Sequence, residues 1–322
     1  MLRFVLGPIF IVALALTATC AGAQDYPNHP IRFLQGFAPG GTADTITRIL
    51  SAEMERTLGQ PIVDEARTGA GGNLASDVTA KARPDGYTLA LLTTGHVISP
   101  AIYKSLSFDP IHDFEFISTV TEFPFFIVTN AQSPYKTLQD LIAAARAKPG
   151  SVTVGTAGIG TGQHMCSELF ATTIGTKFIH VPFRGGQAAV LALLGNNIDF
   201  MIDGGTTVFS GIEAGTLRAL AVSGPQRWPS LPNVPTVQES GFPGFSVLAW
   251  AGVATTKGVP RPIVERLNEA IRSAIASPTV SDRLRSLGGI PSGSTPEEMT
   301  AKVIDQVALW KAVAEKAELV RQ

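Results

Sequence analysis

Residues 38–42 read Ala-Pro-Gly-Gly-Thr, and residues 155–162 read Gly-Thr-Ala-Gly-Ile-Gly-Thr-Gly. Each stretch follows a strand-like apolar run and precedes an amphipathic helical pattern, so each is expected to form the turn that opens a helix. The start of a helix presents backbone N–H groups without intrahelical partners and the positive end of the helix dipole. Two such starts that face one cleft make a site for an anion. The sequence therefore predicts a protein that binds a carboxylate.

The first 23 residues are typical of a secretory signal peptide. Arg3 supplies the positive charge, residues 4–16 form the apolar stretch, and Ala21-Gly22-Ala23 is a small-residue cleavage site. We expect cleavage after Ala23. A membrane-spanning anchor is the alternative, but the apolar stretch is shorter than the ~20 residues that a bilayer requires. A lipid on Cys20 is not expected, because Thr19 is a poor match to the residue that precedes such cysteines.

The composition argues against several kinds of partner. The chain has 25 basic and 26 acidic residues, and cleavage removes Arg3, so the mature protein carries a small net negative charge. This balance argues against binding to nucleic acid or to an anionic membrane surface. Cys166 is the single cysteine that remains after cleavage, which excludes an internal disulfide. A mature chain of this length, with 45% hydrophobic residues, is long enough for two ordinary cores.

Strand-like and helix-like runs alternate along the mature chain, which is typical of an α/β protein whose parallel sheets are covered by helices. The last part is helical, and Thr295, Pro296 and Glu298 form a typical helix start. The expected strands are residues 31–36, 87–93, 125–129, 152–155, 178–181, 198–202, 217–222 and 247–254. The expected helices are residues 46–58, 138–145, 189–194, 262–276, 279–287 and 296–319.

Two stretches are candidates for crossings between domains, namely residues 122–125 and the Gly/Pro/aromatic stretch 241–245. If the chain crosses at both, residues 24–124 and 246–322 form lobe 1, and residues 125–245 form lobe 2. Two crossings make a hinge, and the cleft between the lobes is where a ligand is expected. No zipper or apolar stripe suggests an oligomer, so we expect a monomer.

Seven short segments occur in a specific order: residues 37–44 (FAPGGTAD), 69–73 (GAGGN), 84–89 (PDGYTL), 154–158 (VGTAG), 181–186 (VPFRGG), 231–236 (LPNVPT) and 250–253 (WAGV). With these segments the chain resembles the periplasmic solute receptors of tripartite tricarboxylate transporters, often called Bug receptors. The resemblance covers essentially the whole mature chain. It implies a two-lobed periplasmic-binding-protein fold of type II that closes on an organic carboxylate and delivers it to separate membrane permease subunits.

The resemblance also implies that two loops hold the ligand carboxylate through backbone amides and ordered water. We name residues 38–44 the first pincer loop and residues 155–162 the second pincer loop. Neither contains Arg or Lys, and their glycines let the backbone approach closely. Each helix-start contact contributes about 0.3–1 kcal/mol, and several together can support micromolar binding, roughly −8 kcal/mol. The alternative is a pair of ordinary strand-to-helix turns. The predicted contacts are Pro39, Gly40, Gly41, Thr42, Thr156, Ala157, Gly158, Ile159, Gly160 and Thr161.

Four polar residues near the loops are further candidates. Asp44 either complements the helix dipole and caps free N–H groups, or has a functional role in which it orders the first pincer loop or meets a cationic or hydroxyl group on the ligand. Asp203 ends a strand at the carboxyl edge of a sheet, where it contacts ligand or water, or forms a local turn before glycines. Asn73 either hydrogen-bonds the ligand or caps a helix, and Thr93 is a candidate for the wall of lobe 1.

For two other polar residues near the loops, the sequence leaves two possible roles open. His164 is expected on a polar face, with a ligand contact as the alternative. Arg184 is either a carboxylate clamp or a structural or lobe-contact residue, and the family more often has Lys in a similar place. Four aromatic residues are expected in the core rather than as a platform for the ligand: Phe37, Phe123, Phe125 and Trp250. If any of them faces the cleft, aromatic acids become candidate ligands.

The sequence offers little support for an enzyme. It has no G-x-S-x-G, no H-E-x-x-H and one cysteine after processing, so the recognisable hydrolase, zinc-protease and thiol signatures are missing. After Gly158 and Gly160, the dinucleotide-binding pattern requires glycine where Gln163 stands. We expect neither a cofactor nor a metal. A secreted enzyme that acts on a small acid is the alternative function, and a structural secreted protein is a third class.

Overall fold

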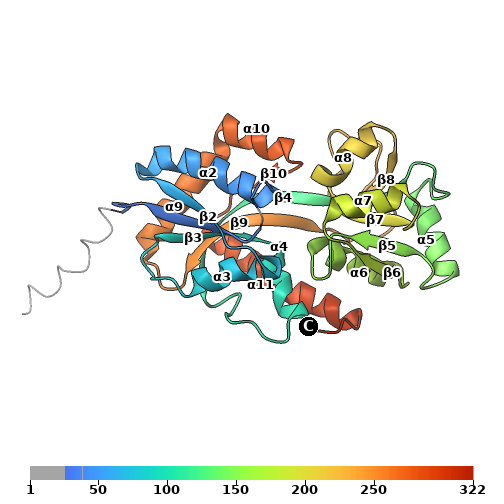
Figure 1. Cartoon of the computed structure of the whole chain (residues 1–322), viewed down its shortest axis with the longest axis horizontal. Coiled ribbons are helices and arrows are strands. Elements are labelled where there is room, and N and C mark those ends of the chain that lie inside the picture. The colour runs from blue at the N-terminus through green and yellow to red at the C-terminus, as the bar shows by residue number, and fades with distance from the viewer. Residues whose placement is uncertain (1–25, 38, 322) are drawn as a thin grey trace, which may run out of the picture.

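The computed structural model describes residues 26–37 and 39–321. The predicted signal peptide, its cleavage site and Cys20 lie outside the described residues, as does Ala38 of the first pincer loop. Within the described part of the chain, no helix is both long enough and apolar enough to cross a bilayer. Figure 1 shows two halves joined by the long strands β4 (Phe114–Asn130) and β9 (Leu248–Thr256), which run side by side between them.

The other strands, within the described residues, are β1 (Ile31–Gln35), β2 (Ile62–Ala66), β3 (Thr88–Thr93), β5 (Thr153–Thr156), β6 (Ile179–Pro182), β7 (Phe200–Gly204), β8 (Leu217–Val222) and β10 (Ile290–Pro291). The hydrogen-bonded order is β2-β1-β3-β9-β4-β7-β5-β6, and β8 and β10 also pair with β4. β1 is parallel to β2 and β3, and β5 is parallel to β6 and β7. β4 and β9 pair antiparallel with their neighbours, so both halves are mixed sheets rather than the expected purely parallel ones.

Strand β4 changes partners in its middle. Its residues from Phe114 to Pro124 pair with β9, and those from Phe125 onward pair with β7 and β8. The sequence predicted only residues 125–129 of this strand, because Glu122 and Pro124 are unusual inside a sheet. The change of partner coincides with the first proposed crossing. The assignment of residues 24–124, 125–245 and 246–322 to two lobes stays a prediction.

Helices cover both faces of the half that holds β1 and β3. One face packs against α2 (Thr42–Leu58), α9 (Arg261–Ala276) and α10 (Pro278–Ser286) around a buried cluster that includes Leu50 and Leu267. The other face packs against α3 (Asn73–Ala80), α4 (Thr94–Ile102) and α11 (Pro296–Lys316). The burial of apolar side chains between these helices and the sheet is the main contribution to the stability of this half.

The half that holds β5 and β7 is covered in the same way. Helices α7 (Gly186–Leu194) and α8 (Gly205–Glu213) lie on one face, and α5 (Leu138–Ala147) and α6 (Gly162–Ile174) lie on the other. The cluster under α5 and α6 is continuous with that under α4 and α11, and it includes Phe125 and Trp250. These two aromatics therefore belong to the core, as the sequence favoured.

Helix α11 confirms the predicted start at Thr295. The Thr295 hydroxyl accepts a hydrogen bond from the Glu298 N–H, and the Glu298 carboxylate accepts one from the Thr295 N–H, which is a complete capping box. The structure also holds elements that the sequence did not indicate: β2, α3, α4, α8 and β10. Of these, α4 contains Gly95 and Pro100, which lower the expectation of a helix.

Candidate functional site

Three helices begin at the same edge of the first sheet. Because β1, β2 and β3 are parallel, their carboxyl ends lie together, and they lead into α2, α3 and α4 respectively. The turns are tightly packed, since a Cβ on Gly36 would lie 2.3 Å from the Gly72 Cα atom. The same Gly-rich turn, at Gly71, has its carbonyl oxygen 2.8 Å from the position of a Cβ on Gly95 in α4. Helix starts therefore converge on this edge.

The first pincer loop is held by Asp44. The Gly40 N–H donates to the Asp44 Oδ2 atom at 3.0 Å, and the Arg48 Nε–H donates to the same oxygen at 3.0 Å. The Arg48 guanidinium, followed by the Gly40 N–H, lowers the pKa of the Asp44 carboxyl. Gly40 has a φ of 83°, a conformation that favours glycine. The Asp44 carboxylate therefore orders the first pincer loop through Gly40, which is part of the second role expected for it, and a contact with the ligand stays a prediction.

Asn73 and Thr93 occupy helix starts beside that loop. Asn73 is the first residue of α3, is buried, and accepts a hydrogen bond on Oδ1 from the Ser99 hydroxyl of α4 at 2.7 Å. Its side chain therefore connects α3 to α4. Thr93 is the N-cap residue of α4 and is half-buried. Their contacts with a ligand stay predictions.

The second pincer loop uses its hydroxyls internally. Thr161 is the N-cap of α6; its Oγ1 accepts from the His164 N–H at 3.3 Å and donates to the Gly158 carbonyl at 2.7 Å. Thr156 is fully buried, and its Oγ1 lies 2.6 Å from the His180 Nε2 atom. The tip residue Ile159 is 53% exposed. The loop therefore offers backbone and an apolar side chain, rather than hydroxyls, to its surroundings.

Asp203 lies near the end of β7 in the second half, just before α8 begins. Its Oδ1 accepts from the Gly204 N–H at 2.7 Å and from the Gln163 Nε2 atom at 3.0 Å. Its Oδ2 is buried without a hydrogen-bond partner among the described residues, beside Gly186 at the start of α7. Burial raises the pKa of this carboxyl, against the opposing effects of Gln163, the Gly204 N–H and the nearby Thr207 hydroxyl. The hydrogen bond to Gly204 agrees with the expected turn, and a contact with ligand or water stays a prediction.

The second pincer loop lies against the first half of the molecule. A Cβ on Gly160 would lie 3.3 Å from the side chain of Ile102, the last residue of α4. The opposite end of α4 adjoins the turn at Gly71. Helix α4 therefore extends from the turn at Gly71 in the first half to the second pincer loop at Gly160.

The position of His164 differs from the polar face expected for it. It is 4% exposed and packs inside the second half, so it is not on a polar surface. Arg184 is exposed. Among the aromatics, Phe37 stands at the entrance to the first pincer loop with 37% of its surface exposed, and Phe123 is half-buried.

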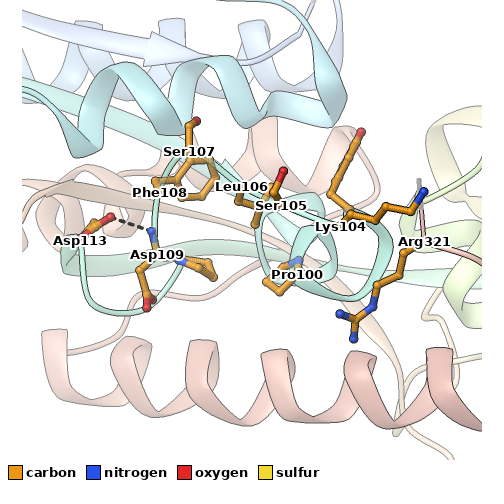
Figure 2. Close-up of a pocket in the computed structure, with 11 residues that line it drawn as sticks. Pro100, Lys104, Ser105, Leu106, Ser107, Phe108, Asp109, Asp113 and Arg321 are labelled. Atoms are coloured by element: carbon orange, nitrogen blue, oxygen red, sulfur yellow. Dashed lines mark hydrogen bonds between the residues drawn. The ribbon is translucent and has the colours of Figure 1, made fainter.

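Two cavities on the surface of the described residues lie away from these loops, and no predicted ligand residue lines them. Figure 2 shows the larger one, about 520 Å³, with Lys104 and Arg321 at one end and Asp109 and Asp113 at the other. The smaller one, about 430 Å³, lies between the starts of α9 and α11. Among the described residues, no group of three His, Cys, Asp or Glu side chains is arranged to hold a metal ion.

The family model of the tripartite tricarboxylate transporter receptor matches residues 46–319. The chain belongs to this receptor family. A protein encoded in the tcbD-tcbE intergenic region of Pseudomonas sp. strain P51 is 38% identical over 93% of this chain and 90% of its own length. The family predicted from the seven segments is confirmed.

Solved structures of the receptor family confirm the fold class. The periplasmic binding protein BugD has a TM-score of 0.77 and 32% identity, and covers 92% of this chain and 100% of its own. R. palustris Rpa4515 with adipate has a TM-score of 0.80 and 30% identity, with the same two coverages. MatC from Rhodopseudomonas palustris with bound malate has a TM-score of 0.76 and 32% identity, covering 90% and 100%. The chain is thus a periplasmic solute-binding receptor of this family, whose members are binding proteins rather than enzymes.

Proposed function

We propose that this receptor captures a small organic carboxylate between the two pincer loops. The observation that carries the proposal is the placement of two cation-free, glycine-rich loops at the starts of α2 and α6, one on each half of the molecule. The backbone N–H groups at a helix start and the helix dipole favour an anion there. Adipate and malate, bound by two related receptors, are carboxylates of this kind.

Closure follows capture in this proposal. Lobe 1 comprises residues 24–124 and 246–322, and lobe 2 comprises residues 125–245. The strands β4 and β9, which pair with each other, join the two lobes. Bending near Pro124 and Leu248, which are paired residues, brings the loops together on the ligand. The closed form then presents a new surface to membrane permease subunits of the tripartite type. The receptor works as a periplasmic monomer after removal of residues 1–23.

A panel of organic acids tests the function. Citrate, malate, adipate, glutamate and benzoate are each added to the purified mature protein, and the unfolding temperature is measured by calorimetry. A ligand at a hundred times its Kd stabilises the native state by about 2.7 kcal/mol, so at least one acid should raise the unfolding temperature by several degrees. A panel in which no acid shifts the transition contradicts the proposal, and conversion of an acid into a product would identify an enzyme.

Salt dependence tests whether neutral backbone groups bind the acid. Raising NaCl from 50 to 500 mM should lower the affinity for the best acid by less than about threefold, because salt screens buried contacts with neutral donors only a little. A pocket lined by Arg or Lys loses much more over this range. Isothermal titration calorimetry at the two salt concentrations measures the ratio. A steep loss of affinity would assign the carboxylate to cationic side chains.

A further inference from the structure

Two imidazole rings lie stacked behind the second pincer loop. His164 is in the first turn of α6 and His180 is on β6. Their ring centroids are 4.1 Å apart with an interplanar angle of 20°. His164 is 4% exposed and His180 is half-buried. Neither ring was expected to act on the loop, because they are brought together only by the pairing of β6 with β5.

Each ring hydrogen-bonds a different part of the loop. The Gly160 N–H donates to the His164 Nδ1 atom at 3.2 Å. His180 Nε2 lies 2.6 Å from the Thr156 hydroxyl, which is also 3.4 Å from the Gly158 N–H. The two rings therefore hold the loop at two points, Thr156 and Gly160. Gly158 and Gly160 have φ of 131° and 75°. Because glycine has no Cβ, these residues do little by themselves to fix the backbone conformation of the loop.

The hydrogen bond from Gly160 defines the protonation state of His164. A ring nitrogen that accepts an N–H has no proton, so the neutral ring carries its proton on Nε2. That atom is 3.6 Å from Glu168 Oε1, which is beyond hydrogen-bond distance. Burial lowers the pKa of His164 to about 3 and that of His180 to about 4, so both rings are neutral near pH 7. A charged His164 would have no lone pair for Gly160.

We propose that His164 and His180 are positioning residues that hold residues 156–160 in the conformation that aims the backbone N–H groups of the second pincer loop, other than those of Gly158 and Gly160, at the ligand carboxylate. This inference rests on the proposed function, since it concerns the same loop. The rings themselves lie behind the loop and contact the ligand only through it. Their effect on binding is therefore indirect, and a substitution that keeps the acceptor should keep the effect.

Three variants test the proposal. His164→Leu removes the acceptor, His164→Asn places an amide oxygen near the position of Nδ1, and Thr176→Val removes a comparable side-chain hydrogen bond, to the Ala145 carbonyl at 2.8 Å, near the other end of α6. The Gly160 amide should exchange with D2O much faster in His164→Leu than in the other two variants. The affinity for the best acid of the panel should fall by up to about tenfold in His164→Leu only, which corresponds to about 1.4 kcal/mol.

Several results would overturn the proposal. Equal Gly160 exchange in His164→Leu and the native protein would show that the ring does not hold the loop. Equal loss of affinity in His164→Asn and His164→Leu would assign the effect to packing alone. If His164→Leu does not fold, nitrogen-15 spectra of labelled histidine in the native protein decide: the proposal requires the Nε2–H form of His164, and the Nδ1–H form contradicts it. If no acid binds the native protein, the proposed function fails, while amide exchange and ring protonation still test whether the two rings hold the loop.

Discussion

Replacing Gly40 by valine should lower the affinity for the carboxylate by about tenfold or more while the protein stays folded. Gly40 has a φ of 83°, and no atom lies within 4 Å of the position of an added Cβ, so the variant meets backbone strain rather than a clash. A side chain other than glycine costs roughly 1–2 kcal/mol in this region, more when it is branched. The loop is expected to relax, which breaks the bond from the Gly40 N–H to Asp44 and moves the N–H groups at the start of α2.

Gly59→Val is the matched control. Gly59 ends the same helix with a φ of 71° and open space around its Cβ position, so it carries the same strain far from the ligand. Isothermal titration calorimetry and denaturant unfolding are measured on both variants. Both should lose similar stability, and only Gly40→Val should lose affinity. Equal affinity in the two variants would remove the first pincer loop from the binding site.

Lowering the pH from 7 to 5 should destabilise the fold by about 3 kcal/mol. Burial lowers the pKa of His96 to about 4, and burial also lowers the pKa of His164 and His180 to about 3 and about 4. These histidines titrate near 6.5 when unfolded, so between pH 6.5 and 4 the unfolded chain binds more protons than the native protein. Their stabilising contribution is complete above pH 6.5 and is lost as the pH falls. His180 is half-buried, so solvent screens part of its share.

Two buried carboxyls act in the opposite direction. Burial raises the pKa of Glu168 and of Asp203, so the native protein takes up protons there before the unfolded chain does, which offsets part of the loss. Urea unfolding at pH 7 and pH 5 measures the difference. His96→Gln, which removes one buried imidazole, should reduce the dependence on pH by about half or more. A free energy of unfolding that is equal at the two pH values would contradict neutral burial of the imidazoles.

Local sequence signals were sufficient for much of the fold. The strand at residues 217–222 and the capping box at Thr295 depend on patterns within a few residues, and the structure reproduces both. The first part of β4 was missed because its pairing with β9 compensates for Glu122 and Pro124, and that partner lies more than a hundred residues away. Short β2 was missed for a similar reason, since Asp64 and Glu65 obscure its apolar pattern.

The candidate site divides in the same way. Glycine patterns located the two helix starts, because a turn of this kind needs residues that tolerate unusual backbone angles. Side-chain directions depend on tertiary neighbours. Asn73 turns to Ser99 of α4, and Thr156 turns to His180, neither of which is close in sequence. The stacked pair of His164 and His180 behind the second pincer loop could therefore not be predicted from the sequence, because it depends on the pairing of β5 with β6.

A crystal structure of the receptor with its best acid tests the central claim most directly. The account predicts that the carboxylate oxygens lie about 3 Å from backbone N–H groups at the starts of α2 and α6, or reach them through a single water. It also predicts that no Lys or Arg side chain touches the carboxylate. An acid held by cationic groups, such as Lys104 and Arg321 in the cavity of Figure 2, with both pincer loops turned to solvent, would contradict the account.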